Sequence, residues 1–513
     1  RHPAPQRRES AAAPRSRVRD RDDHGRSRTA ARRHRPGHRA RGRTRGCGGS
    51  QIWNEHQRIA DHDRADRGED GGCRGRRSGR RGHQRRSAEA RDPSRRDQAD
   101  RARVAPRAIR RALRAERGGL PLRVRRPAAV AAGAHRGHHR EEQAGGLASG
   151  DRQRSLCARR GSARLRLSGL AAPARAVIEA AIGSLCTACV VRVERRGEID
   201  VFATGTLCPD ERAGPDAPCT AESLFDLASL TKLATTALAL SFVRQRVLAL
   251  DTPFRELVPD FRGGRKDDVT LDHVLTHTGG LTWWLPLWKE VTTLEEAVWR
   301  AAQEPLAQDL GTFTYSDLGY IMLTQGLATI GGRPFPDLVR EIVLGPVEAS
   351  TADFGPRPPE RCVATEEDTE WRKRRLRGEV HDENAFSVGG SCGHAGLFGT
   401  AADVAKLARV FRDGAVIGND LAALARTERV KQGNVRRGIG LALRAPDGPM
   451  VGRHFSVDAY GHTGFTGTSL WVDPQLDLTV VLLTNRVYFG RNNDDATYRF
   501  RIAVHEAVSA PFA

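Results

Sequence analysis

Lysine is absent from the first 231 residues of this 513-residue chain, although the chain as a whole is strongly basic. Residues 1–170 contain 47 arginines and 18 acidic residues, a net charge of +29. The remainder contains 37 basic and 44 acidic residues, a net charge of −7. The overall charge of +22 therefore comes from the first third alone. It gives no reason to expect a polyanionic partner for the other two thirds.

The same arginine-rich segment has Trp53 as its only aromatic residue and shows no periodic apolar pattern. Such a segment buries too little apolar surface to offset the entropy lost on ordering. Three interpretations compete: a nucleic-acid-binding arm, a disordered extension, or GC-rich coding DNA read in the wrong frame. Because the basic clusters lack interleaved aromatics, we do not expect a nucleic-acid partner. We treat 1–170 as a low-complexity segment, disordered or mis-framed, and 171–513 as one domain.

Long apolar runs are also missing, so we expect no membrane-spanning helix. No export signal is visible at the start, where the first residue is Arg1. The nine cysteines are an odd number and cannot all pair within the chain. Cys186 and Cys189 have the C-x-x-C spacing, but no second pair follows at zinc-site distance, so we interpret them as residues at the start of a strand.

The pattern changes near Ala171, where apolar residues begin to recur with regular spacing. Strands at both ends with helices between them predict an α+β fold whose sheet is assembled from distant segments. Strands are expected at 189–193, 200–203, 468–472 and 478–484, and helices at 174–182, 233–242, 318–330, 335–343, 402–411 and 498–508, with Thr270 capping a further helix.

Ser229 and Lys232 form a Ser-x-x-Lys pair at the start of an apolar, helix-periodic run. Residues three apart share a helix face, so the hydroxyl and the amine are expected to meet. A serine hydroxyl needs such a neighbour to become a nucleophile, although the pair alone is short and common by chance.

Two further groups follow in order. Tyr315, with Asp317 two residues later, precedes a helix, and a phenol beside an ammonium is a candidate base or proton shuttle. His462, Thr463 and Gly464 precede the strand at 468–472 and are expected on an edge strand. There the ring and the hydroxyl would face the substrate, and the glycine would let its backbone approach.

Together these motifs resemble those of the class C β-lactamase and penicillin-binding-protein-like serine hydrolases, Ser-x-x-Lys, Tyr-x-Asn and Lys/His-Thr-Gly. The resemblance covers about residues 172–510 and includes a Gly-Glu-Val-His-Asp-Glu-Asn-Ala block at 378–385 and Gly-His-Ala-Gly-Leu-Phe at 393–398. It implies an antiparallel sheet flanked by helices, a mostly helical domain, and a site between them. It also suggests the cell envelope or periplasm, while a cytoplasmic location stays open.

Carried onto this sequence, the resemblance assigns Ser229 as the acylated nucleophile and Lys232 as its partner in proton transfer. Tyr315 becomes general base and acid, although either it or Lys232 can take the serine proton. His462 and Thr463 would face a substrate carboxylate. The backbone N–H groups of Ser229 and Phe465 would form the oxyanion hole.

Asp317 and His462 depart from the more common asparagine and lysine. Both changes reduce positive charge or amide donors in the site, which argues against efficient β-lactam hydrolysis. We therefore expect a metal-independent, cofactor-free serine hydrolase that acts on an ester, peptide or amide, with a D-amino-acid peptide favoured. The alternatives are a β-lactamase proper, a catalytically silent peptide-binding homologue, and a nucleic-acid-binding protein led by the arginine-rich arm. The sequence does not predict an oligomeric state.

Three other patterns receive structural interpretations. A second His-Thr-Gly, at His277, is expected to be a turn at a helix end. His381, Asp382 and Glu383 are consecutive and so are not expected to converge on one metal ion. Trp283 and its neighbours Trp284 and Trp288 are expected in the core or the wall of a cleft.

Overall fold

The computed structural model describes residues 169–446 and 450–513, which all belong to one compact unit of the chain. The expectations for the arginine-rich segment, including Trp53, concern residues up to position 168, and these lie outside the described ranges. The domain boundary near residue 171 remains a prediction.

An antiparallel sheet of eight strands has the order β2-β1-β13-β12-β11-β10-β9-β8. It joins the two ends of the described chain, because β1 pairs with β13 from Cys189 opposite Thr484 to Arg195 opposite Leu478. The strands are β1 (Ala188–Arg195), β2 (Glu198–Gly205), β8 (Val430–Gln432), β9 (Val435–Arg437), β10 (Ala442–Leu443), β11 (Tyr460–Thr463), β12 (Ser469–Asp473) and β13 (Leu478–Thr484). Two small sheets contain the other strands. One has three strands, β3 (Phe225–Asp226), β4 (Asp353–Phe354) and β7 (Leu397–Gly399), and the other has two, β5 (Glu367–Asp368) and β6 (Arg374–Arg375).

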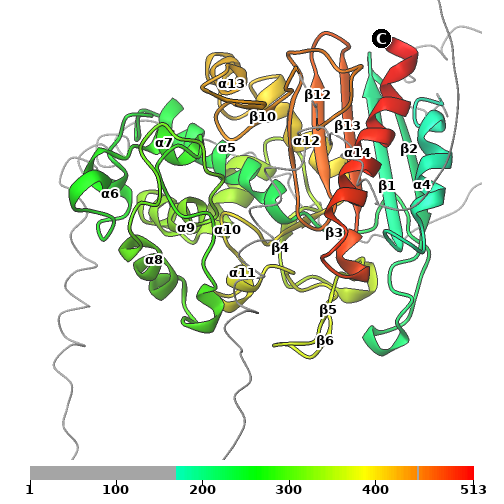
Figure 1. Ribbon diagram of the computed structural model, residues 1–513, viewed down its shortest axis with the longest axis horizontal. Helices are drawn as coiled ribbons and strands as arrows, with labels where there is room; N and C mark the ends of the chain where they lie inside the picture. The colour runs from blue at the N-terminus through cyan, green and yellow to red at the C-terminus, as the bar shows by residue number, and fades with distance from the viewer. Residues whose placement is uncertain (1–168, 447–449) are drawn as a thin grey trace, which may run out of the picture. The chain divides into compact units, whose positions relative to one another are not determined.

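Helices cover both faces of this sheet, which explains why its central strands are almost wholly apolar. Cys189, Val191 and Val193 of β1 pack in a cluster with α4 (Arg175–Ala181) and α14 (Asp494–Ser509). Val190 points to the other face and joins the cluster that includes α12 (Ala401–Arg412). Figure 1 shows α14 and α4 beside the β1–β2 end of the sheet.

The helical part of the fold is built around two buried helices, α5 (Thr231–Arg244) and α9 (Leu318–Gly331). Nearly every residue of α5 from Thr231 to Phe242 is buried, so this helix has no solvent face for most of its length. The remaining helices are α6 (Phe254–Leu257), α7 (Leu271–Leu275), α8 (Leu294–Gln303), α10 (Phe335–Leu338) continued by a π-helical turn at Val339–Leu344, α11 (Glu383–Ser387) and α13 (Asn419–Arg426).

The predicted α+β architecture of an antiparallel sheet, flanking helices and a helical part is confirmed. The Thr270 cap is also confirmed, since its hydroxyl accepts a hydrogen bond from the His273 N–H. The edge-strand prediction for His462 was wrong as stated, because β11 lies between β12 and β10. Pairing with β10 ends at Gly461, however, so His462 and Thr463 pair on one side only, with β12. The polar end of β11 is thus a local edge inside the sheet.

Candidate active site

Ser229 lies in a tight 3-10 turn, Ala228–Leu230, that leads directly into α5. Ala228 has a φ of 48°, which is costly for a residue with a side chain. Asp226 supports this turn by accepting a hydrogen bond from the Ala228 N–H at 2.8 Å. Strain that the surroundings hold in place is typical of functional positions. The turn presents Ser229 at the N-terminal end of a buried helix.

Lys232 follows one turn later, and its side chain has no exposed surface. Its ammonium nitrogen lies 2.9 Å from Ser229 Oγ, 3.2 Å from the carbonyl oxygen of His394 and 2.7 Å from Asp317 Oδ1. An ammonium group has three N–H donors and no lone pair. Lys232 therefore donates to Ser229 Oγ and to the His394 carbonyl, and it forms an ion pair with Asp317.

The charge state of Lys232 follows from this environment. Burial acts to lower the pKa of Lys232, but the Asp317 carboxylate and the Tyr315 phenol outweigh it and raise the pKa above the usual lysine value. Lys232 is therefore a cation at neutral pH. In this state it donates to Ser229 and cannot accept its proton.

Tyr315 and Asp317 lie on the segment that leads into α9, whose first residue is Leu318. The Lys232 nitrogen is 5.0 Å from the centre of the Tyr315 ring, and that ring is 6.1 Å from the ring of His462. The Asp317 N–H donates to the carbonyl of Trp283 at 2.9 Å. The Tyr315–Asp317 motif therefore lies beside Lys232, and His462 lies beside Tyr315.

The loop between β11 and β12, which contains Phe465, is hydrogen-bonded to the residues just before the Ala228–Leu230 turn. Thr466 and Thr468 donate side-chain hydrogen bonds to the carbonyls of Asp226 and Leu227, at 2.8 and 3.0 Å. The Phe465 carbonyl accepts from Arg486 Nε at 2.7 Å. The two threonine bonds tie the loop to the residues just before Ser229.

Gly464 also has a structural role. A Cβ atom built there would lie 2.6 Å from the Leu227 carbonyl oxygen and 3.3 Å from the Ala228 Cβ. The glycine is thus required for contact between the loop and the Ala228–Leu230 turn. Its role toward a substrate backbone stays a prediction.

His462 is buried and neutral. Burial, reinforced by the positive charges of Arg437 and Lys232, lowers the pKa of His462 well below the usual histidine value. Its Nδ1 donates to the Thr463 carbonyl at 2.8 Å, which leaves Nε2 as a hydrogen-bond acceptor. Within the described part of the chain, Nε2 has no partner. An acceptor without a partner therefore remains beside Tyr315.

His277 was predicted to be a turn residue, and it does follow α7 with a φ of 59°. The structure adds that its ring is 4.6 Å from the Tyr315 ring and 5.4 Å from the Tyr320 ring. Its Nδ1 accepts the Ser316 N–H at 3.1 Å, which fixes the segment that carries Tyr315. Sequence reasoning missed this contact, although the repeated His-Thr-Gly was the available signal.

Arg437 at the end of β9 was also missed. Its guanidinium carbon lies 5.4 and 5.8 Å from the ring centres of Phe313 and Tyr315, and the residue is 8% exposed. Among the described residues, its Nε and Nη2 have no hydrogen-bond partner and no carboxylate pairs with it. A buried charge without a counterion is costly. The site therefore has one cation in excess.

The remaining candidates are structural. Cys186 and Cys189 are free and buried at the start of β1, and burial raises the pKa of Cys186 to about 12. No cluster of three histidine, cysteine, aspartate or glutamate side chains suited to a metal occurs within residues 169–446 and 450–513. Trp283, Trp284 and Trp288 are partly buried, with the first two rings stacked 5.6 Å apart. In the same ranges, every helix is too short or too polar to cross a membrane.

A family model described as Beta-lactamase matches residues 185–504, more than half of the chain. The chain belongs to the β-lactamase family. This confirms the predicted resemblance and makes the protein a member of a family of serine hydrolases.

Three relatives show the range of this family. An N-acetylmuramyl-L-alanine amidase of Bacillus subtilis (strain 168) is 31% identical over 309 residues, 52% of this chain and 68% of that protein. An Escherichia coli (strain K12) protein to which D-alanyl-D-alanine carboxypeptidase activity is attributed is 29% identical over 52% of this chain and 70% of its own. Esterase EstB of Burkholderia gladioli is 28% identical over 63% of this chain and 90% of its own.

A solved class C β-lactamase from Rhodobacter sphaeroides has the same fold. It aligns with a TM-score of 0.54 and 20% identity over 66% of this chain and 99% of its own. This likeness supports the β-lactamase fold of the catalytic part.

Proposed function

We propose that this family member forms an acyl-enzyme at Ser229 and cleaves a peptide or ester bond close to a substrate carboxylate, with D-amino-acid peptides as the favoured substrates. The observation that carries the proposal is the fully buried Lys232 ammonium, which donates to Ser229 Oγ at 2.9 Å. A buried ammonium group could be satisfied by other hydrogen-bond acceptors. A serine hydroxyl, in contrast, needs an adjacent activating group to act as a nucleophile.

The lysine geometry narrows the choice of base. Because Lys232 is cationic and already donates to Ser229 Oγ, with Asp317 paired to it, Tyr315 is the better candidate to take the serine proton. Ser229 Oγ bonds to the substrate carbonyl carbon, and its proton passes to the Tyr315 oxygen while the Tyr315 hydroxyl proton passes to the leaving group. The bond between the carbonyl carbon and the leaving group then breaks, which leaves the acyl group on Ser229. Lys232 stabilises the negative charge that develops on Ser229.

The tetrahedral intermediate needs donors for its oxygen, for which the N–H groups of Ser229 and Phe465 are the candidates. Losing one such donor typically costs roughly 2.7–4 kcal/mol of barrier. A water molecule then adds to the acyl carbon, its proton returns through Tyr315, and Ser229 leaves with a proton. Over the whole cycle the substrate and one water molecule become two products, and Ser229 and Tyr315 each regain a proton.

Arg437 supports a substrate that carries a carboxylate. His462 is neutral, so it cannot supply the charge that a lysine supplies at that position of the motif. Arg437 supplies a cation on the same side of the site, and its Nε and Nη2 lack partners in the described chain. A substrate carboxylate would compensate this charge. This favours D-alanyl peptides over neutral esters, while EstB keeps a carboxylic ester as the second candidate.

A substrate panel tests this proposal. The purified chain is incubated with a D-alanyl-D-alanine peptide, the same peptide with an amidated terminus, a p-nitrophenyl ester and nitrocefin. We expect hydrolysis of the free-acid peptide above the amidated one, slow turnover of nitrocefin, and no activity in Ser229→Ala. Folded wild-type protein that cleaves none of these substrates would support the silent peptide-binding homologue.

A further inference from the structure

The segment at 378–398, which sequence analysis singled out without a role, lies directly behind Lys232. The Lys232 nitrogen donates to the main-chain carbonyl of His394 at 3.2 Å. The His394 side chain points elsewhere, and its Nε2 lies 2.8 Å from Asp382 Oδ1. The imidazole is 1% exposed, and the carboxylate is partly buried. One residue thus contacts the lysine through its backbone and an acidic residue through its ring.

The ring contact is an ion pair at neutral pH. Burial acts to lower the pKa of His394, but Asp382 outweighs it and raises the pKa well above the usual histidine value. The same pairing holds the pKa of Asp382 below its usual range, against the effect of burial. The pair is therefore charged, and its geometry is fixed by attraction as well as by hydrogen bonding.

Asp382 also stabilises helix α11, which contacts the loop that precedes Asp317. It caps α11 by accepting the Ala385 N–H at 2.8 Å. In the same helix, Asn384 accepts the Trp288 N–H at 3.0 Å and donates to the Leu285 carbonyl at 2.8 Å. That loop begins near Trp283, whose carbonyl accepts the Asp317 N–H.

Two groups that contact Lys232, the His394 carbonyl and the Asp317 carboxylate, are thus connected to Asp382 through hydrogen bonds. His394 supplies one through its own backbone, and Asp317 is connected through α11 and the tryptophan loop.

We propose that the His394–Asp382 pair is a positioning element that holds the His394 carbonyl on Lys232 and so orients the lysine toward Ser229. The proposal rests on the proposed function, in which Lys232 assists acylation. Gly393 is held by two threonines, since its N–H donates to Thr324 Oγ1 at 2.8 Å and its carbonyl accepts from Thr235 Oγ1 at 2.7 Å. The next residue, His394, is fixed in addition by its ring contact with Asp382. Without its ionic contact the carbonyl would shift, and one lysine donor would lose its acceptor.

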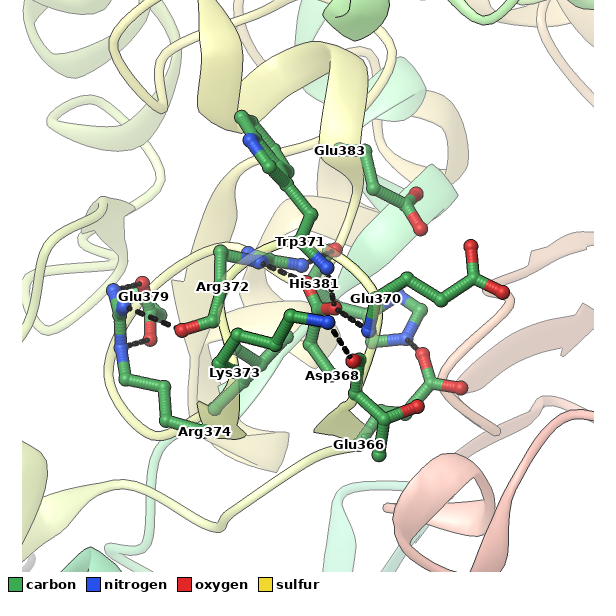
Figure 2. Close-up of polar contacts among 12 residues, drawn as sticks. Glu366, Asp368, Glu370, Trp371, Arg372, Lys373, Arg374, Glu379, His381 and Glu383 are labelled. Carbon is green, nitrogen blue, oxygen red and sulfur yellow. Dashed lines mark hydrogen bonds and ion pairs between the residues drawn. The ribbon is translucent and has the colours of Figure 1, made fainter. Parts of the chain in front are cut away.

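The chain contains a matched control. His381 and Glu366 form a second histidine–carboxylate pair, also at 2.8 Å, with side chains 4% and 14% exposed (Figure 2). This pair belongs to the same segment of the fold but makes no contact with Lys232 among the described interactions. Glu366→Gln therefore removes a carboxylate that contacts a histidine, and the Glu366–Arg491 ion pair with it, without touching a group that contacts Lys232.

The test compares Asp382→Asn with Glu366→Gln in the full chain. Acylation of Ser229 by a fluorescent penicillin is followed across pH, because a misplaced catalytic group slows such a step by roughly 10- to 100-fold. We expect that loss in Asp382→Asn, with an unchanged apparent dissociation constant for the probe and an alkaline limb moved to lower pH. Glu366→Gln should keep the wild-type rate and profile.

Equal losses in both variants, or a wild-type rate and profile in folded Asp382→Asn, would overturn the proposal. Hydrogen–deuterium exchange provides a readout that does not depend on catalysis. Amides at 393–397 should exchange faster in Asp382→Asn and stay protected in Glu366→Gln, and unchanged protection in both would contradict the positioning role. Wild-type protein that is never labelled at Ser229 would instead overturn the proposed function, while the exchange comparison would still decide the role of the pair.

Discussion

Lys232 and Asp317 form an ion pair with a 2.7 Å separation, in which the lysine side chain has no exposed surface. The family motif more often has asparagine at the position of Asp317. The aspartate changes the site in two ways: it keeps Lys232 protonated, and it removes an amide donor from the substrate side. Both effects bear on which bond the enzyme cleaves.

Asp317→Asn should move the alkaline limit of activity to lower pH. Burial lowers the pKa of Lys232, and the Asp317 carboxylate is the main opposing influence. Without this charge, the lysine loses its proton at a lower pH than in the wild type. The added amide should also raise the rate of penicillin acylation. A pH profile of acylation measures both effects, and an unchanged alkaline limb would show that Asp317 does not control the lysine.

Arg437→Gln should weaken the binding of carboxylate-bearing substrates. A hydrogen bond to a charged group contributes about 1.5–3 kcal/mol, so KM should rise roughly 10- to 150-fold. An amidated substrate should show little change. Arg436→Gln is the control, because Arg436 pairs with Glu428 at the opposite side of the strand. Equal effects on free-acid and amidated peptides would remove Arg437 from substrate recognition.

Tyr315→Phe should lower the acylation rate by about 10²- to 10⁴-fold, the usual contribution of proton transfer. Tyr320→Phe removes the same hydroxyl from the neighbouring buried tyrosine, which bonds to Thr236 Oγ1 at 3.0 Å. That control should lose stability and keep the acylation rate. Stopped-flow labelling separates the two variants. A near-wild-type rate in Tyr315→Phe would return the role of base to Lys232.

Glu366 should contribute to stability above pH 4.5. Burial acts to raise the pKa of Glu366, but His381 and Arg491 outweigh it and lower the pKa to about 2. Because the folded-state pKa is depressed, the contribution is present above the unfolded value of about 4.5 and is lost between there and about pH 2. Glu366→Gln should therefore flatten the acid limb of the unfolding free energy, by an amount on the order of 3 kcal/mol. Urea unfolding at several pH values measures this, and parallel acid limbs would contradict it.

The long apolar segments were predictable because their periodicity is local. The strand at 478–484 was predicted with its observed bounds, and the helix at 318–330 differs from α9 by one residue. Ser229, Lys232, Tyr315 and His462 were recognisable because short motifs carry them in a fixed order. The Ser229–Lys232 contact follows from their spacing of three residues, whereas the contacts of Tyr315 and His462 follow from the family fold.

The other site residues could not be predicted from local sequence patterns. Arg437 reaches Tyr315 only because the β8–β9 hairpin lies against the segment before α9, where the Phe313 N–H donates to Gln432 at 3.0 Å. His394 acts on Lys232 through a carbonyl oxygen, which every residue type possesses. His277 resembles an ordinary helix end in the sequence, and only the fold places the Tyr315 ring 4.6 Å from its ring. In each case a tertiary contact between distant segments creates the role.

The central claim is that Ser229 becomes covalently acylated. Intact-protein mass spectrometry after incubation with a penicillin or a fluorophosphonate, followed by peptide mapping, tests it most directly. We predict one adduct per chain, located on the peptide that contains Ser229 and absent from Ser229→Ala. A folded wild-type protein with no adduct, or with its adduct on another residue, would contradict the account.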